Sequence, residues 1–185
     1  MIKINNLSFS YADKSIFENF SLEIPNGGRI CIFAESGRGK TTLLRLILGL
    51  EKTDFGSIET GGARMSAVFQ EDRLLPFKTA LGNITLMGAD EKTALYNLSA
   101  LGIGAAAEKY PFELSGGMRR RVAIARALSA EYDCLVLDEP FAGLDKENIE
   151  NAAKHILQGL NGRTLIAVTH SEYEAELLGA GIIYI

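Results

Sequence analysis

A glycine-rich segment in the first quarter of the chain has the residue types and the spacing that bind phosphate. The segment reads AESGRGKTT, follows a short apolar run and opens a stretch of helical periodicity. Gly37 and Gly39 allow backbone N–H groups to converge without a Cβ clash, and N–H groups at the positive end of a helix attract an anion. We expect Lys40 to reach the outer phosphates of a polyphosphate, the Thr41 hydroxyl to bind Mg²⁺ and Thr42 to support the inner phosphates. The expected contacts of this loop are Ala34, Glu35, Ser36, Gly37, Arg38, Gly39, Lys40, Thr41 and Thr42.

The first position of the loop departs from the usual pattern, because Ala34 stands where glycine is common. A methyl group is tolerated there if φ is negative, and the backbone N–H donors of the loop remain. We therefore expect phosphate binding to survive, with a tilted entry to the loop. Taken alone, the segment also fits an ordinary glycine-containing turn before a helix.

Two carboxylates follow another apolar run, CLVL, roughly 100 residues after the loop. The carboxyl ends of parallel strands face the ligand crevice of an α/β sheet. Asp138 is then placed to hold Mg²⁺ through water, and Glu139 can act as a general base on an attacking water. Alone, such a pair often marks only the start of a helix. Its position after a phosphate loop favours the catalytic interpretation.

A second anion site is predicted where Ser115, Gly116 and Gly117 precede a helix, because these residues expose N–H groups at its N-terminus. One chain has little use for two such sites on one nucleotide. The alternative is a simple helix N-cap with flexible glycines.

An α/β fold with a mostly parallel central sheet has to position these motifs. Alternating apolar residues over 2–11 and 20–24 predict two half-buried antiparallel strands, an N-terminal antiparallel β subdomain. We expect a hairpin region over 54–69 with a strand at 67–69. Buried strands are expected at 30–33, 134–137, 164–168 and 181–185, and helices from residue 40, within 79–109, up to about 130 and over 149–160.

The size and composition of the chain limit the classes of protein that it can be. Its 185 residues, 47% of them hydrophobic, suit one globular domain over 1–185, with a short helical subdomain inserted at about 72–130. A net charge of −4 gives no overall attraction to nucleic acid. Cys31 and Cys134 lie in apolar runs and are expected to be reduced core thiols. Without a membrane-spanning stretch or a signal core, the chain is expected to be cytoplasmic.

The order of motifs along nearly the whole chain resembles that of the ATPase subunit of ABC transporters, which is a P-loop NTPase. The motifs, in order, are AESGRGKT, Gln70, LSGGM, CLVLDEP, AGLD ending at Asp145, and VTH ending at His170. The run QEDRLLP at 70–76, and Met118 after the glycines, are similar to the ATPases of nitrate, sulfonate and taurine importers.

The resemblance implies a role for each matching residue. Tyr11 would stack on adenine, although an aromatic residue at a strand end is the alternative. Gln70 would ligate Mg²⁺ and report on a permease. The signature residues 115–117 would touch the γ-phosphate of ATP bound by a second subunit, and Asp145 would cross the dimer interface. His170 would contact the γ-phosphate as a switch, so that Lys40, Glu139 and His170 form the catalytic set.

The resemblance also implies the partners of the chain. Family members form head-to-tail homodimers that enclose two ATP molecules, bound with Mg²⁺, and they dock on integral membrane permease subunits served by an external solute-binding protein. The chain would then be peripheral on the cytoplasmic face of the membrane and would bind no nucleic acid. We expect no regulatory domain after His170.

Two other functions stay open on the sequence alone. One is a soluble ABC-type ATPase that acts on nucleic acid or ribosomes, and the other is a regulatory ATP-binding module without turnover.

His155 is expected to be structural or exposed. The arginines that follow the signature residues either contact phosphate or are solvated and ion-paired; they are Arg119, Arg120, Arg121 and Arg126.

Overall fold

The computed structural model describes residues 1–12, 14–35 and 37–185. The strands are β1 (Ile2–Tyr11), β2 (Lys14–Ile24), β3 (Arg29–Phe33), β4 (Phe55–Glu59), β5 (Met65–Val68), β6 (Cys134–Asp138), β7 (Thr164–Val168) and β8 (Gly181–Tyr184). The α-helices are α1 (Lys40–Ile47), α2 (Ala80–Thr85), α3 (Glu91–Ala100), α4 (Gly116–Ser129), α5 (Lys146–Leu160) and α6 (Glu172–Leu177). Two short 3₁₀ turns are η1 (Gly104–Ala106) and η2 (Pro111–Glu113).

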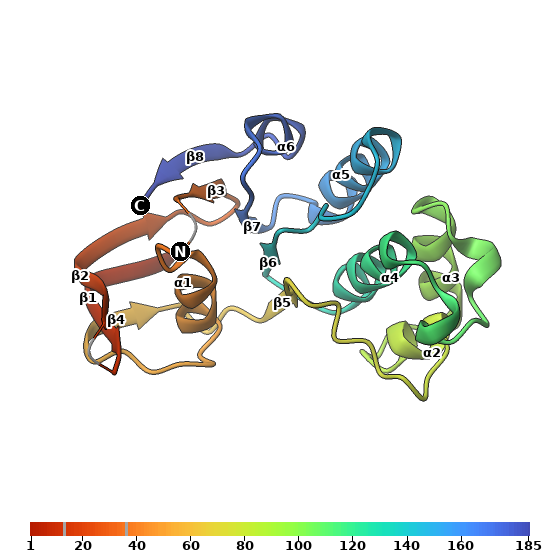
Figure 1. The fold of residues 1–185 in the computed structure, drawn as a ribbon, viewed down its shortest axis with the longest axis horizontal. Coiled ribbons are helices and arrows are strands. Elements are labelled where there is room, and N and C mark those ends of the chain that lie inside the picture. The colour runs from red at the N-terminus through yellow and green to blue at the C-terminus, as the bar shows by residue number, and fades with distance from the viewer. Residues whose placement is uncertain (13, 36) are drawn as a thin grey trace.

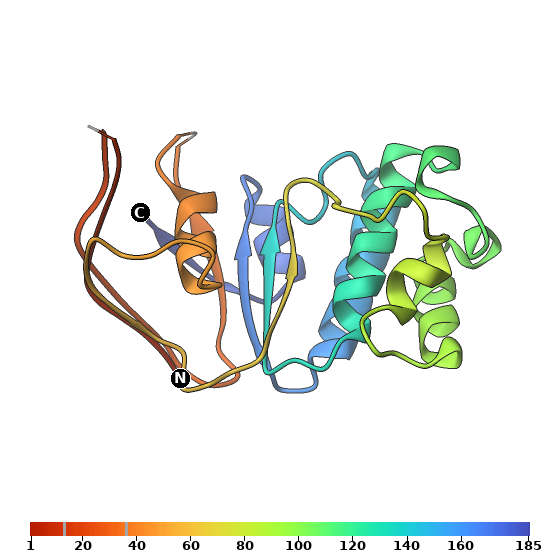
Figure 2. The same ribbon diagram turned by 90° about the horizontal axis from the view of Figure 1, so that it is seen from below.

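The strands form two sheets, as the alternating and continuous apolar patterns predict. A three-stranded antiparallel sheet has the order β2-β1-β4, and a five-stranded parallel sheet has the order β5-β6-β7-β3-β8. Figure 1 shows α1 between the two sheets, and Figure 2 shows α4 and α5 on the other face of the parallel sheet. Helices α2 and α3 lie beyond α4, at the end of the molecule furthest from the antiparallel sheet.

The parallel sheet separates two hydrophobic cores, because successive residues of a strand point to opposite faces. In β3, Ile30 and Ile32 face the core beneath the antiparallel sheet and α1. Cys31 and Phe33 face the core beneath α4 and α5. Cys134 belongs to the first core, so the two cysteines are free thiols in different cores, and burial raises the pKa of each to about 12. The prediction of separate core thiols is confirmed.

The predicted hairpin over 54–69 is wrong, because β4 and β5 belong to different sheets. β4 pairs antiparallel with β1, whereas β5 pairs parallel with β6 and runs over Met65–Val68 rather than 67–69. Asp133 supplies the physical reason: its carboxylate accepts from the Arg64 N–H at 2.9 Å, and its own N–H donates to the Arg64 carbonyl at 2.8 Å. These long-range bonds place the start of β5 beside β6, which the local turn residues do not reveal.

His155 is structural, and the alternative that it is exposed is wrong. It lies on the buried side of α5 and is 6% exposed. Its Nε2 is 2.8 Å from Oδ1 of Asn97 on α3, and the ring of Tyr96 packs against it edge to face. Burial lowers the pKa of His155, so the neutral ring is the form that suits this site.

In the described parts of the chain, no helix is long and apolar enough to cross a membrane.

Candidate active site

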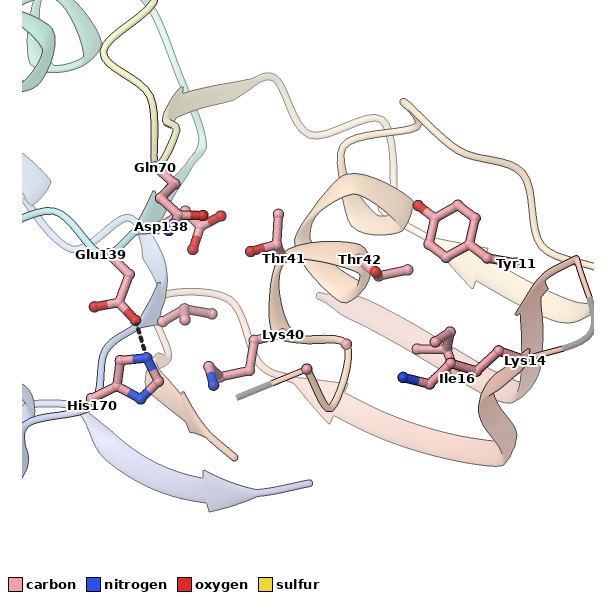
Figure 3. Close-up of a pocket in the computed structure, with 13 residues that line it drawn as sticks. Tyr11, Lys14, Ile16, Lys40, Thr41, Thr42, Gln70, Asp138, Glu139 and His170 are labelled. Carbon is pink, nitrogen blue, oxygen red and sulfur yellow. Dashed lines mark ion pairs between the residues drawn. The ribbon is translucent and has the colours of Figure 1, made fainter. Parts of the chain in front are cut away.

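A cavity of about 500 Å³ opens at the carboxyl ends of the central strands β6 and β7 (Figure 3). Its walls come from segments that are far apart in sequence, including the end of β1, the start of β2, the loop before α1 and the end of β6. The predicted site residues that line this cavity are Tyr11, Gly37, Gly39, Lys40, Thr41, Thr42, Gln70, Asp138, Glu139 and His170.

The loop before α1 has the backbone that its glycines predict. Gly37 has a φ of +79° and Gly39, the N-cap of α1, has a φ of +91°. Lys40 is only 8% exposed, and its side chain folds back over the loop. Its ammonium donates to the carbonyl of Ala34 at 2.7 Å and to that of Glu35 at 3.1 Å. The loop thus concentrates positive charge and N–H groups at the floor of the cavity.

Other members of the predicted loop lie at its rim or outside the described residues. Glu35 and Arg38 form an exposed pair whose Oε2 and Nε are 3.8 Å apart, and they do not line the cavity. Ser36 lies outside the described residues, so its predicted contact is not placed. Ala34 is not among the residues with positive φ, which is the condition under which its methyl group is tolerated.

Gly39 should be far less tolerant of a side chain than Gly37. A Cβ on Gly39 would lie 2.4 Å from Cγ2 of Ile16 and 3.1 Å from Cζ of Phe17, whereas a Cβ on Gly37 meets nothing within 4 Å. We expect Gly37→Ala to lower the free energy of unfolding by about 1 kcal/mol through backbone strain, and Gly39→Ala by about 2–4 kcal/mol through strain and overpacking. Urea unfolding measures both. Equal losses would contradict the close approach, and Ile16→Ala should recover part of the Gly39→Ala loss.

Asp138 offers an unpartnered carboxylate oxygen to the cavity. The residue is 3% exposed, and its Oδ1 is buried without a hydrogen-bond partner among the described residues. Burial raises the pKa of Asp138, while the Thr41 hydroxyl and the cations of Arg120 and Lys40 oppose the rise. A buried carboxylate oxygen beside a hydroxyl and the Gln70 amide is an oxygen donor set that suits a hard divalent cation.

The three donors, Thr41, Gln70 and Asp138, come from three separate segments, and only Asp138 is a carboxylate. Among the described residues, no group of three or more His, Cys, Asp or Glu side chains could hold a metal ion. Oxygens of phosphates held by the adjacent loop could serve as further ligands of a cation at Asp138.

Glu139 forms an ion pair across the mouth of the cavity with His170, and its Oε1 is 2.8 Å from Nε2 of the ring (Figure 3). Glu139 has a φ of +50°, a left-handed conformation that is uncommon for a non-glycine residue. Its N–H donates to the Val168 carbonyl at 2.9 Å, which ties the end of β6 to the end of β7. Burial raises the pKa of Glu139, and His170 opposes the rise. A carboxylate with a raised pKa is a stronger proton acceptor.

Three further residues line the cavity that were not predicted as site residues: Lys14, Ile16 and Val168. Lys14 and Ile16 stand on the wall that carries Tyr11, whose ring packs edge to face on Phe9 at 4.8 Å between centroids (Figure 3). The register of β1 and β2 aligns Tyr11 with Lys14 and so creates this wall. No sequence motif marks these positions. The pairing of β1 with β2 is the signal that could have placed Lys14 opposite Tyr11.

The structure leaves the second predicted anion site outside the cavity. Ser115 is the N-cap of α4, and its Oγ accepts from the Met118 N–H at 3.2 Å. Asp145 is the N-cap of α5, and it accepts from the Asn148 N–H at 2.9 Å. Neither residue lines the cavity, and nor do Gly116 and Gly117, so these groups face another part of the surface.

The arginines of α4 make contacts within the protein. None of them is among the residues that line the cavity, and Arg120 is only 5% exposed. Arg119 and Arg121 donate to the carbonyls of Leu114 and Leu101 at 2.9 and 3.1 Å. The ion-paired alternative is supported for Arg119 and Arg120, whose Nε atoms lie 3.9 and 3.3 Å from the Asp72 carboxylate, whereas the buried Arg120 is not solvated.

Known proteins are similar in sequence to this chain over most of its length. Residues 17–142 match the ABC transporter family. The aliphatic sulfonates import ATP-binding protein SsuB 2 of Xanthomonas axonopodis pv. citri is 37% identical, over 98% of this chain and 66% of its own length. The nitrate import ATP-binding protein NrtC of Synechocystis is 41% identical, over 90% of this chain and 28% of its own length. The chain thus spans about two thirds of the first relative.

A solved structure shares the fold. The dimeric bacterial ABC transporter cassette MJ0796 is 29% identical, with a TM-score of 0.89, over 100% of this chain and 94% of its own. The same cassette is known in a post-hydrolysis state bound to ADP and Pi, where the TM-score is 0.88. The predicted fold class is confirmed by the two sheets together with this likeness.

Proposed function

The chain belongs to the ABC transporter family, and from this premise we propose that it binds and hydrolyses ATP to drive a solute across a membrane. The observation that carries the proposal is the single cavity that joins the phosphate loop to Asp138, Glu139 and His170. The import functions named for the related proteins favour transport over the nucleic-acid and regulatory alternatives.

In this proposal the residues of the cavity divide the work of phosphoryl transfer. The N–H groups of the loop and the Lys40 ammonium hold the phosphates and stabilise the charge that develops on them. Glu139 accepts a proton from the water that attacks the γ-phosphorus, and its raised pKa suits that task. His170, paired with Glu139 at 2.8 Å, reaches the γ-phosphate and reports its presence. Tyr11 packs on the adenine, with Lys14 and Ile16 beside it.

We assign Mg²⁺ to Thr41, Gln70 and Asp138. The unpartnered Oδ1 of Asp138 supports the assignment, since a buried carboxylate oxygen is otherwise left unsatisfied. Bound Mg²⁺ would neutralise charge on the β- and γ-phosphate oxygens.

A head-to-tail homodimer would give a use to the groups outside the cavity. Ser115, Gly116 and Gly117 would contact the γ-phosphate bound by a second copy, and Asp145 would lie at the interface between the copies. Two features support this: both segments cap helices at the surface, and the related cassette MJ0796 is described as dimeric.

A mostly apolar groove of about 430 Å³ is proposed as the docking site of an integral membrane permease. The groove lies between the end of α1, β5, α2 and α4, and it exposes Leu50, Leu75, Leu86 and Met87 by 50%, 41%, 60% and 47%. Exposed apolar side chains gathered in this way mark interaction sites. Phe69 also lines the groove, so a partner there would touch the segment that carries Gln70.

Leu86→Glu should therefore abolish co-purification of the permease from detergent-solubilised native membranes, because it places a charge in the apolar groove. The matched control is Phe55→Glu, which changes a 75% exposed apolar residue on β4 that does not line the groove, and it should retain the permease. Identification of the retained protein by mass spectrometry also tests the transport proposal. Loss of the permease in both variants, or in neither, would refute the groove as the docking site.

The remaining parts of the proposal follow from docking. The chain would be peripheral on the cytoplasmic face of the membrane, and residues 72–130 would act as a helical subdomain that carries the docking groove toward the permease. The permease and an external solute-binding protein would select the solute.

A further inference from the structure

Helix α4 holds the backbone of the segment that carries Gln70. The Arg120 guanidinium donates from Nη1 to the carbonyl of Phe69 at 2.6 Å, and from Nη2 to the carbonyl of Gln70. The Arg120 side chain is 6% exposed, so these bonds are shielded from water. Hydrogen bonds from a buried charged donor are among the stronger ones in proteins.

The same helix holds the next part of the segment through a second arginine. Arg126 donates from Nη1 to the carbonyl of Arg73 at 2.7 Å and from Nη2 to that of Asp72 at 2.9 Å. The Asp72 carboxylate lies between arginines of α4, with Oδ1 3.3 Å from Nε of Arg120 and Oδ2 3.9 Å from Nε of Arg119. Two guanidinium groups of one helix therefore bind four carbonyls within five residues.

The parallel sheet does not provide an equivalent attachment for this segment. The pairing of β5 with β6 ends at Val68, opposite Leu137. Immediately after this last pair, the carbonyls of Phe69 and Gln70 accept from Arg120. The polar backbone that carries Gln70 is thus attached to α4, which begins directly after Ser115.

Resting on the proposed function, we propose that Arg120 is a positioning residue, which makes Gln70 move with the helix that begins at Ser115. When Ser115 of this helix engages ATP held by a second copy, the Arg120 bonds carry the Gln70 backbone with it and bring the amide to its place at Mg²⁺. Arg120 itself touches neither nucleotide nor metal. It links Gln70, assigned to the Mg²⁺ of the chain's own ATP, to Ser115, assigned to the γ-phosphate of the partner's ATP.

A double-mutant cycle of Arg120→Gln with Gln70→Ala tests this link. Because Lys40 and Thr41 are untouched, we expect Arg120→Gln to lower kcat about tenfold while the Kd for ATP stays within about twofold. If Arg120 acts through Gln70, adding Arg120→Gln to Gln70→Ala should cause little further loss. Arg120→Lys, which keeps the charge, should recover part of the activity. Independent, multiplying losses would overturn the proposal.

Arg121→Gln is the matched control, because it removes another internal arginine of α4. Arg121 donates to the Leu101 carbonyl at 3.1 Å and to Oδ1 of Asn148 at 2.8 Å, and it does not bond to the Gln70 segment. Its effect should therefore multiply with that of Gln70→Ala. Thermal unfolding of each variant identifies any general loss of stability.

Hydrogen exchange without nucleotide tests the attachment separately from catalysis. The amides of residues 69–73 should exchange at least tenfold faster in Arg120→Gln than in the wild type, while those of α1 and β6 stay unchanged. Unchanged exchange over 69–73 would overturn the proposal whatever the activity. Faster exchange in a chain that hydrolyses no ATP would instead refute the proposed function and leave the attachment standing.

Discussion

Glu139→Gln should lower the rate of ATP hydrolysis by about 10²–10⁴-fold while ATP still binds, because the amide cannot accept a proton from the attacking water. Glu139 has the position that this role requires, at the end of β6 in the cavity that holds the phosphate loop. The variant keeps the shape of the side chain, so the ATP-bound state should accumulate as a dimer. Phosphate release measures the rate, and size-exclusion chromatography with ATP and Mg²⁺ measures the dimer.

Glu176→Gln is the control for the change in charge. Glu176 is an exposed residue of α6, so its variant should hydrolyse ATP at the wild-type rate. Turnover at the wild-type rate in Glu139→Gln would show that another group acts as the base.

Lys40→Ala should weaken ATP binding by about 10- to 150-fold, which corresponds to the loss of a charge-assisted contact of about 1.5–3 kcal/mol. The Lys40 ammonium lies on the floor of the cavity, against the carbonyls of Ala34 and Glu35 at 2.7 and 3.1 Å. Binding of phosphates would draw it away from these carbonyls to a stronger acceptor. Isothermal titration with ATP at a fixed Mg²⁺ concentration measures the change.

Lys40→Met separates the charge from the shape of the side chain. Methionine keeps most of the apolar length, so it should weaken binding about as much as alanine does if the charge is decisive. A much larger loss in Lys40→Ala alone would indicate collapse of the loop. An ATP affinity that is unaltered in both variants would contradict the phosphate-loop interpretation.

The positions that the sequence predicted well are those whose chemistry is local. The glycines with positive φ before α1 and the carboxylates at the end of β6 each depend on a few consecutive residues. Buried parallel strands leave continuous apolar runs, so β3, β6 and β7 were visible without a structure. The ABC family was evident for the same reason, because its motifs are short and follow one another in a set order.

The predictions that failed or were missing concern contacts between distant segments. A hairpin was expected over 54–69, yet the bonds between Arg64 and Asp133 join β5 to β6. The sequence left phosphate contacts and solvated or ion-paired side chains open for the arginines of α4, and neither alternative specified that Arg120 bonds to carbonyls 50 and 51 positions away in sequence. Nothing in the residues near Arg120 specifies these acceptors.

The sequence alone therefore predicted a polyphosphate site at the loop with Gly37 and Gly39, and determined which carboxylates follow the strand beside it. Backbone conformation within a few residues decides both. The tertiary structure alone decided that Glu139 and His170 meet at 2.8 Å, that Ile16 closes over Gly39, and that α4 holds the Gln70 segment. Each of these contacts joins separate elements, so it depends on strand pairing and core packing across the whole fold.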